Sequence, residues 1–463
     1  MNVTGRLVNF CHGITYESLP EEVRDRAKYF LLDFLGVALR ASEAASSRVL
    51  YNFARKRAPQ GPCTVIGSAL RTDAPHAALV NGGVGHAIEM DDVTTVSSLH
   101  PGVSVMPTAL AAAEVSHGDP RRVISAIVAG YEVTNRVGNA VNCRSHYARG
   151  FHPTATCGTF GAAVVASKVL GLSLEATLNA FGIAGSQAAG SMQYLDNGAW
   201  TKRFHPGWAA HSGILAAYLA QEGYTGPADI LGGTSGFLHG YSDESYPERL
   251  TRGLGECWEI QETAIKPHAC CRYNHASVDC TAQLCTLHDI QPEEVEGVEV
   301  RVPKTGLDIV SEPLEAKRDP KNVVDAQFSL PYAVAVAILR RRAGLEEYSD
   351  DFLRAHAYAQ VIPKVRCVGD EELEAHFPDQ WSARVSIRTR RGTFSGEVAH
   401  PKGDKRNPLT WEELEARFRD LTRPVLEEGT RGKLIERVRG LERLAHVQAV
   451  TDLLRVREKL AVR

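Results

Sequence analysis

The hydrophobic pattern changes near residue 265, and this change most constrains the fold. Before it, apolar residues recur at helical spacing, as over 23–39, directly after the capping-box sequence SLPE at 18–21. After it, Val298, Val300 and Val302 alternate with charged residues, the pattern of a half-buried strand. A chain of 463 residues also exceeds what one hydrophobic core organises. The sequence therefore predicts a helical part followed by a second, mixed domain.

The predicted helices of the first part are dense in alanine and glycine. Small residues let helix backbones approach closely, so we expect a compact bundle that is buried on many sides. Ser173 is a candidate N-cap for one of these helices. After the helix over 23–39, the predicted helices cover 103–116, 121–141, 158–171, 174–188 and 209–222.

The second domain combines strands with one apolar helix. Strands are predicted over 298–302 and 383–389, and the second turns at Arg391-Gly392 into a hairpin partner over 393–398. The segment 327–341 reads as a helix that is apolar on nearly every side. This pattern indicates a small α+β domain, which ends in a loop at 401–404.

Helices resume after that loop and continue to the C-terminus. A second capping box, TWEE, begins at Thr410, and the last helix carries a stripe formed by Leu441, Leu444, Val447 and Leu454. The expected fold is mostly α with an α+β second domain: a helical domain over 1–264, an α+β domain over 265–404, and the rest of the helical domain over 405–463.

Composition excludes several classes of partner. The formal net charge is −3, from 52 Lys and Arg against 55 Asp and Glu, so neither nucleic acid nor a membrane surface is an expected partner. No run of about 18 apolar residues predicts a membrane span. The N-terminus lacks the apolar core of a signal peptide, which favours a cytoplasmic location. The ten cysteines read as small buried hydrophobes; a zinc site at His268, Cys270, Cys271 and His275 is the alternative.

The stretch GHAIEMDDVTTVSSLHPG (85–102) places three acids within four positions. Glu89, Asp91 and Asp92 lie between His86 and His100, in surroundings of small and apolar residues. A buried carboxylate without a partner would take up a proton. Either distant cations pair with these acids, or the site serves proton transfer; a solvated acidic face is the remaining interpretation.

Other short polar segments interrupt the apolar ones, and each has a structural explanation when it is taken alone. His152 before a proline can be a helix-entry residue, Lys202 at a helix start can be solvated, and Tyr332 can be a core aromatic with a satisfied hydroxyl. The polar segments at 266–275 and 402–404 follow the same pattern. Their joint occurrence at the edges of small-residue segments favours one shared site. The sequence has no GxGxxG after a strand, GxxxxGK[ST], GxSxG or HExxH, so no metal or cofactor is favoured.

Seven blocks of this sequence resemble, in order, those of the MmgE/PrpD family. They are GHAIEMDDV, HPG, FHP, TKRFHPGWAA, KPHACCRYNHA, AQFSLPYAVA and PKGDKRNPLT. The family includes 2-methylcitrate dehydratases, cis-aconitate decarboxylases and an iminodisuccinate epimerase. The resemblance implies a large helical domain with a smaller α+β lid, a homodimer, and no metal or other cofactor.

The resemblance also assigns site residues. It implies that His100, His152 and Tyr332 are catalytic, together with an acid. The acidic position of the family falls on Glu89, one methylene longer than the usual aspartate, so either Glu89 or Asp92 meets the substrate. The corresponding substrate-binding residues, which are cationic and suited to carboxylates, are Lys202, Lys266 and Arg272. The same three cations are the expected partners of the acids in the stretch 85–102.

These residues suit proton transfer at a carbon next to a carboxylate. Histidines titrate near neutrality and serve as general acids and bases, while cations stabilise developing negative charge. The expected function is a cofactor-independent lyase acting on a small di- or tricarboxylate, with dehydration slightly ahead of decarboxylation. Two alternatives stay open. They are an epimerase that returns the proton to the opposite face, and a non-catalytic carboxylate-binding protein.

Overall fold

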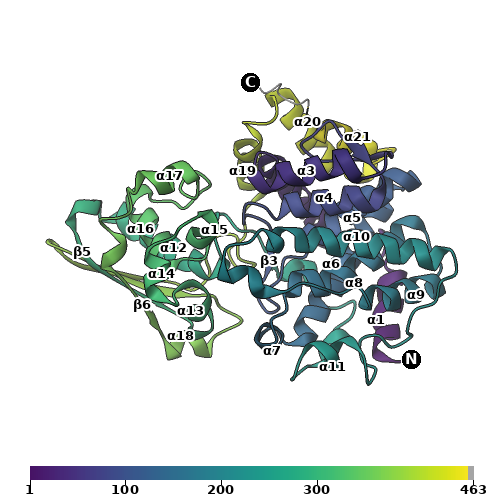
Figure 1. Cartoon of the computed structure of the whole chain (residues 1–463), viewed down its shortest axis with the longest axis horizontal. Coiled ribbons are helices and arrows are strands. Elements are labelled where there is room, and N and C mark those ends of the chain that lie inside the picture. Colours follow the sequence, from purple (N-terminus) through teal and green to yellow (C-terminus); the bar gives the residue numbers. More distant parts are fainter. Residues whose placement is uncertain (457–463) are drawn as a thin grey trace. The chain divides into compact units, whose positions relative to one another are not determined.

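The computed structural model describes residues 1–456, and the chain forms two compact units (Figure 1). Unit 1 comprises 1–87, 91–263 and the chain from 410 onward; unit 2 comprises 88–90 and 264–409. The predicted fold class, mostly helical with an α+β second part, is confirmed. Among the described residues, no helix is both long and apolar enough to cross a membrane.

Unit 1 consists of helices with a few two-residue strands. Its helices are α1 (Val3–Gly13), α2 (Glu21–Ala41), α3 (Ala45–Arg57), α4 (Ala74–Gly85), α5 (Gly102–Ser116), α6 (Pro120–Val141), α7 (Cys143–Ala148), α8 (Pro153–Leu170), α9 (Leu174–Gly185), α10 (Thr201–Gln221), α11 (Phe237–Tyr241), α19 (Trp411–Thr422), α20 (Glu428–Arg439) and α21 (Gln448–Thr451). The short strands β1 (Cys63–Thr64) and β2 (Arg71–Thr72) pair with each other. Further two-residue strands are β3 (Val93–Thr94) and β4 (Thr263–Ala264).

The core of unit 1 lies where α4, α5, α8 and α10 pack against one another (Figure 1). Glycines make this packing close. A Cβ on Gly82 of α4 would lie 2.8 Å from Cα of Gly207 on α10, and one on Gly207 would lie 2.1 Å from the carbonyl oxygen of Leu79. A Cβ on Gly213 would lie 2.4 Å from that of Ala162 on α8. The bundle expected from small residues is confirmed, and backbones rather than long side chains form its contacts.

Two predicted helix starts are too late, and one predicted cap is wrong. Helix α8 begins at Pro153 and α10 at Thr201, so Lys202 and His205 lie on α10. Pro20 occupies the N-cap position of α2 without a side-chain cap bond. Ser18 instead exchanges hydrogen bonds with Thr15 in the preceding turn, so its hydroxyl is committed there. Ser173 does cap α9, by accepting from Ala176 N.

Unit 2 contains a four-stranded sheet in the order β6-β5-β7-β8. The strands are β5 (Val295–Val302), β6 (Val365–Gly369), β7 (Ala383–Thr389) and β8 (Gly392–Val398). Strand β5 pairs antiparallel with β7, which forms the predicted hairpin with β8. Strand β6 pairs parallel with β5 and was not predicted, because its sequence VRCVG is too short and mixed to show alternation.

Helices cover this sheet. The helices of unit 2 are α12 (His275–Leu287), α13 (Lys304–Val310), α14 (Leu314–Arg318), α15 (Val323–Gln327), α16 (Leu330–Arg340), α17 (Asp350–Ala355) and α18 (Glu371–Ala375). Helix α12 packs on β7 and β8, and α16 packs on α12 and β6. Every residue of α16 from Leu330 to Ile338 is buried, which confirms the helix that is apolar on nearly every side.

The C-terminal segment is only partly as predicted. The capping box at Thr410 forms with both of its hydrogen bonds and starts α19. The predicted continuous helix carrying Leu441 to Leu454 is wrong. A 3-10 turn at Leu441–Arg443, α21 and a second turn at Asp452–Leu454 replace it, and they still bury all the predicted stripe except Leu444. Residues 457–463, which the predicted C-terminal helices include, lie outside the described residues.

The close contact of α4 with α10 predicts a large penalty for one added methyl group. Gly207→Ala is expected to lower the free energy of unfolding by about 1–3 kcal/mol, because its Cβ would collide with backbone that cannot rotate away. Gly432→Ala in α20 is the matched control: its Cβ would meet nothing among the described residues, and alanine favours a helix. Urea denaturation of both variants tests this. Equal stability of the two variants would contradict the packing argument.

Candidate functional site

Four imidazoles form a continuous chain of rings in unit 1. From His100 through His86 and His152 to His205, successive ring centroids lie 5.0, 6.0 and 5.2 Å apart. His86 ends α4, His100 precedes α5, His152 is the N-cap residue of α8, and His205 lies on α10. The close helix packing thus brings these rings together. We call these four residues and Asp91 the histidine cluster.

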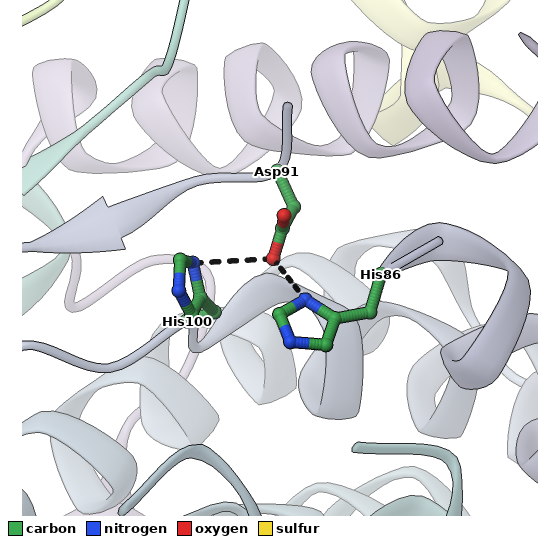
Figure 2. Close-up of side chains that lie close together, drawn as sticks. All are labelled: His86, Asp91 and His100. Atoms are coloured by element: carbon green, nitrogen blue, oxygen red, sulfur yellow. Dashed lines mark hydrogen bonds and ion pairs between the residues drawn. The ribbon is translucent and has the colours of Figure 1, made fainter. Parts of the chain in front are cut away.

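Asp91 holds two of these rings through one carboxylate oxygen. Figure 2 shows Oδ2 of Asp91 facing Nδ1 of His86 at 2.7 Å and Nδ1 of His100 at 3.2 Å. Asp91 is only 2% exposed, so water screens these interactions little. A carboxylate that accepts from Nδ1–H fixes the orientation and the tautomer of an imidazole.

The tautomer of His100 follows from a second contact. Its Nδ1 lies 2.6 Å from the backbone oxygen of Asp92. A carbonyl oxygen can only accept, so Nδ1 of His100 carries the proton and donates. In the neutral ring the basic lone pair is therefore on Nε2. An imidazole held in this way by a carboxylate is suited to take up a proton at Nε2, because Asp91 stabilises the resulting positive charge.

The same atoms are the only group of three or more metal-ligand side chains identified among residues 1–456. His86, Asp91 and His100 each offer one ligand atom, and these atoms lie within 4.8 Å of one another. The Nδ1–H of His100 is already a donor, however, so this nitrogen could bind a cation only after losing its proton and its bond to Asp92. The Nδ1 atom of His100 is thus engaged with the protein, and Nε2 is the nitrogen that remains basic.

His152 and His205 form a neutral pair. Their Nδ1 atoms lie 3.0 Å apart, which requires one ring to donate and the other to accept. Burial lowers the pKa of His152 well below its ordinary value, and the neighbouring His205 ring and the charge of Lys202 lower it further. Burial also lowers the pKa of His205 to about 4. The expectation that both predicted catalytic histidines titrate near neutrality is therefore wrong for His152.

Asp92 is tied to the start of α5. Its carboxylate accepts from the Tyr131 hydroxyl at 2.6 Å and from Gly102 N at 3.1 Å. The pKa of Asp92 is raised to about 8, chiefly by burial and also by the charges of Asp91 and Asp33, although the bonds from Tyr131 and Gly102 act to lower it. These contacts occupy the carboxylate of Asp92, and its backbone oxygen accepts from His100. Asp92 is therefore suited to positioning His100.

Glu89, the other acidic candidate, lies in unit 2 with Lys266. Glu89 Oε2 and Lys266 Nζ are 3.2 Å apart, and the two residues are 4% and 0% exposed. Lys266 is therefore a cationic partner of these acids, as predicted. The backbone of Glu89 has φ +57°, a left-handed conformation that aspartate and asparagine adopt more readily than glutamate. A buried ion pair thus holds the residue that departs from the family pattern in a strained conformation.

Arg272 has a different partner from the one predicted. Its Nη2 donates to Asp404 Oδ2 at 2.7 Å rather than to an acid of the stretch 89–92. The reason is that the segments 265–275 and 402–404 lie side by side. Gly403 permits this approach: it has φ +86°, and a Cβ there would lie 2.1 Å from the Ile265 oxygen.

Several buried polar atoms near Arg272 have no hydrogen-bond partner in the described part of the chain. They are Nη1 of Arg272, Oδ1 of Asn274 and Oε1 of Gln327. Asn274 and Gln327 are in contact, through a bond from Asn274 Nδ2 to the Gln327 oxygen. Buried polar groups are normally satisfied, so an unsatisfied guanidinium nitrogen indicates a place for an anionic or water ligand.

The remaining two candidates differ in what surrounds them. Lys202 is 6% exposed in the first turn of α10, so the solvated alternative is wrong. Tyr332 is fully buried in α16, and its hydroxyl donates to the Glu347 oxygen at 2.5 Å. Burial raises the pKa of Tyr332 far above its ordinary value. This geometry matches the core-aromatic interpretation, and its catalytic role stays a prediction.

The alternative zinc site has no support in the geometry. His268 Nε2 bonds to Asp279 at 2.7 Å and His275 Nε2 lies 3.2 Å from the Cys270 oxygen, so these nitrogens face protein acceptors. The sequence prediction left out three members of the histidine cluster, namely His86, Asp91 and His205. All three stand inside the predicted motifs, and their burial among apolar neighbours was the available signal.

The relatives of this chain are lyase-type enzymes, and this places the chain among the lyases. The MmgE/PrpD N-terminal domain model matches residues 5–250, and the C-terminal domain model matches residues 268–443. This chain belongs to the MmgE/PrpD family, which confirms the resemblance.

Its relatives span two named activities. The chain is 29% identical to the cis-aconitate decarboxylase-like protein oryM of Aspergillus oryzae, over 98% of this chain and 97% of that protein. It is 28% identical to cis-aconitate decarboxylase of Aspergillus terreus, over 98% and 96%. It is 22% identical to 2-methylcitrate dehydratase of Salmonella typhimurium, over 85% and 84%. The decarboxylase relatives thus align over more of both chains.

The raised pKa of Asp92 predicts a pH-dependent contribution to stability. In the unfolded chain this group releases its proton near pH 4, whereas in the folded protein it keeps it up to about pH 8. Between these values stability falls as pH rises, by at most about 1.4 kcal/mol per pH unit. Asp92→Asn is expected to remove this slope. The free energy of unfolding of the wild type should therefore fall relative to that of the variant as the pH rises from about 5 to about 8.

Urea titrations at several pH values measure this difference. Asp119→Asn is the control, since Asp119 caps α6 at an exposed position and asparagine is a good cap. A constant difference between wild type and Asp92→Asn across this range would show that Asp92 does not hold a proton.

Proposed function

We propose that this protein is a lyase that acts on a small di- or tricarboxylate by proton transfer at a carbon next to a carboxylate. The observation that carries the proposal is the Asp91–His100 pair. Because Nδ1 of His100 must donate to the Asp92 oxygen, its Nε2 is left as the basic atom. His100 thus acts as the general base or acid, and Asp91 orients it and balances its charge.

The other residues divide into two roles. His152 is kept neutral by burial, so it suits hydrogen bonding to the reacting group, with His205 fixing its tautomer. Lys202, Lys266 and Arg272 supply positive charge for substrate carboxylates and for the charge that develops when a bond to carbon breaks. Of the acids, Glu89 is proposed to contact substrate through its pairing with Lys266, and Asp92 to position His100.

Decarboxylation is the first reaction to test, ahead of the dehydration that the sequence slightly favoured, because the decarboxylase relatives match over nearly the whole chain. With cis-aconitate, the bond to one carboxylate would break. The electron pair would pass to the carbon skeleton, which takes up one proton, giving CO₂ and an unsaturated dicarboxylate. Dehydration of 2-methylcitrate would remove a carbon-bound proton and a neighbouring hydroxyl as water.

One assay distinguishes these reactions. The protein is incubated in D₂O with cis-aconitate, 2-methylcitrate, citrate and iminodisuccinate and followed by NMR. We expect CO₂ loss from cis-aconitate with one deuterium entering the product. Alkene formation from 2-methylcitrate would instead select the dehydratase, and exchange with inversion on iminodisuccinate the epimerase. Ligand-induced stabilisation without turnover would contradict the lyase proposal and favour a binding protein.

The role of His100 predicts a loss of kcat without a loss of fold. Asparagine can keep the donor toward the Asp92 oxygen but has no basic nitrogen, so His100→Asn is expected to lower kcat by about 10²–10⁴-fold with little change in the melting temperature. His117→Asn is the control: His117 ends α5 at φ +49°, which asparagine tolerates. Wild-type turnover by His100→Asn would remove the proposed base.

The role of Arg272 predicts an effect on substrate binding. Arg272→Lys keeps a charge for Asp404 but loses the second nitrogen of the fork, so KM should rise roughly tenfold while kcat changes little. Arg366→Lys, at an exposed strand position, is the control. An unchanged KM in the steady state would exclude Arg272 from carboxylate binding.

Three further properties belong to the proposal. The protein is proposed to act without a metal or other cofactor, as a homodimer, and in the cytoplasm. The donor role of His100 Nδ1 supports the first of these, since the best-placed ligand atoms are already hydrogen-bonded. Activity retained after dialysis against EDTA would support metal independence, and activity restored only by a divalent ion would contradict it.

A further inference from the structure

A polar cavity lies in unit 1 and shares no residue with the histidine cluster. Its volume is about 290 Å³. The turn after α1 forms one wall, the start of α6 another, and the end of α8 a third. Ile14 and Leu172 give it an apolar part, and Thr15, Tyr16 and Ser125 add hydroxyl groups.

Cations outnumber carboxylates around this cavity. Arg121, Arg122 and Lys168 line it, against Glu17 and Asp119. Both carboxylates are already engaged. Glu17 lies 3.7 Å from Arg121 Nη1, and Asp119 accepts from the backbone N of Arg121 as the cap of α6.

Arg122 and Lys168 are left without a carboxylate within ion-pair distance among residues 1–456. Lys168 Nζ donates one hydrogen bond, to the His12 oxygen at 2.9 Å, and an ammonium group has three donors. Burial and the positive charge of Arg122 lower the pKa of Lys168 to about 8. Two neighbouring cations repel each other, and an anion placed between them stabilises both.

A structural explanation accounts for only part of this arrangement. Lys168 lies in the last turn of α8, where a cation favours the negative end of the helix dipole. That effect needs no cavity and no second cation. It does not explain why Arg122, from the first turn of α6, faces the same space, with Nη1 only 3.1 Å from where a Cβ on Gly171 would lie.

We propose that this cavity binds a small multivalent oxyanion, held by Lys168 and Arg122 and by hydroxyl groups of the turn after α1. The shared chemistry of the ligand is two or more anionic oxygens on a compact group, as in a phosphoryl group or a polycarboxylate. Arg122 supplies a two-pronged donor for such oxygens, and Lys168 supplies a point charge. The site is separate from the proposed reaction and would regulate or stabilise unit 1.

Isothermal titration calorimetry with two probes tests the proposal. Pyrophosphate represents the phosphoryl source, and tricarballylate, which has no double bond or hydroxyl to react, represents the carboxylate source. We expect wild type to bind at least one probe, and Lys168→Met to weaken that binding by about tenfold or more. Arg122→Gln, at an exposed position, should weaken it similarly and guards against misfolding of the first variant.

Lys56→Met is the matched control, because Lys56 is an exposed lysine in the last turn of another helix of the same unit, α3. It should bind as wild type does, within about twofold. His100→Asn should also leave unchanged the binding that Lys168→Met and Arg122→Gln weaken, which separates this cavity from the proposed active site. No binding of either probe up to about 10 mM, or equal binding by wild type and both cavity variants, would overturn the proposal.

Discussion

The close approach of helix backbones in unit 1 is the constraint on which the rest of the site depends. Gly82 and Gly207 let α4 and α10 meet with no side chain between them, and α8 packs against α10 through Gly213. Histidines stand at or near the ends of these helices, so packing distances of the backbone set the distances between rings. A larger residue at such a contact would move His205 and His152 apart before it touched either ring.

Burial then determines what each titratable group can do. Within the histidine cluster, desolvation keeps His152 uncharged and Asp91 has two imidazole donors, while desolvation lets the adjacent Asp92 hold a proton. Groups with opposite tendencies placed side by side are what proton transfer requires, because one must be ready to accept while its neighbour stays neutral. The low dielectric also strengthens the hold of Asp91 on His100, which a solvated carboxylate could not match.

The sequence predicted the helical part, the hairpin of β7 with β8, and two members of the histidine cluster, His100 and His152, because periodicity and motif position are local properties. It could not predict β6, whose five residues show no alternation, or the start of α10 ahead of Pro206. It paired Lys266 with the acids correctly but gave Arg272 the wrong partner, since Asp404 reaches it only through the glycine turn at 403. Pairings across more than a hundred residues depend on packing, which no local pattern records.

Glu89 has a backbone conformation and a buried position that a glutamate does not favour. Its left-handed backbone and its burial both oppose a glutamate, and the ion pair with Lys266 offsets part of this cost. An aspartate would relax the backbone but shorten the reach toward the lysine by one methylene. The longer side chain therefore moves the carboxylate relative to Lys266 by about a bond length (~1.5 Å). If Glu89 contacts substrate as proposed, a change of that size would alter which substrate fits without moving His100, so chemistry and specificity could vary separately.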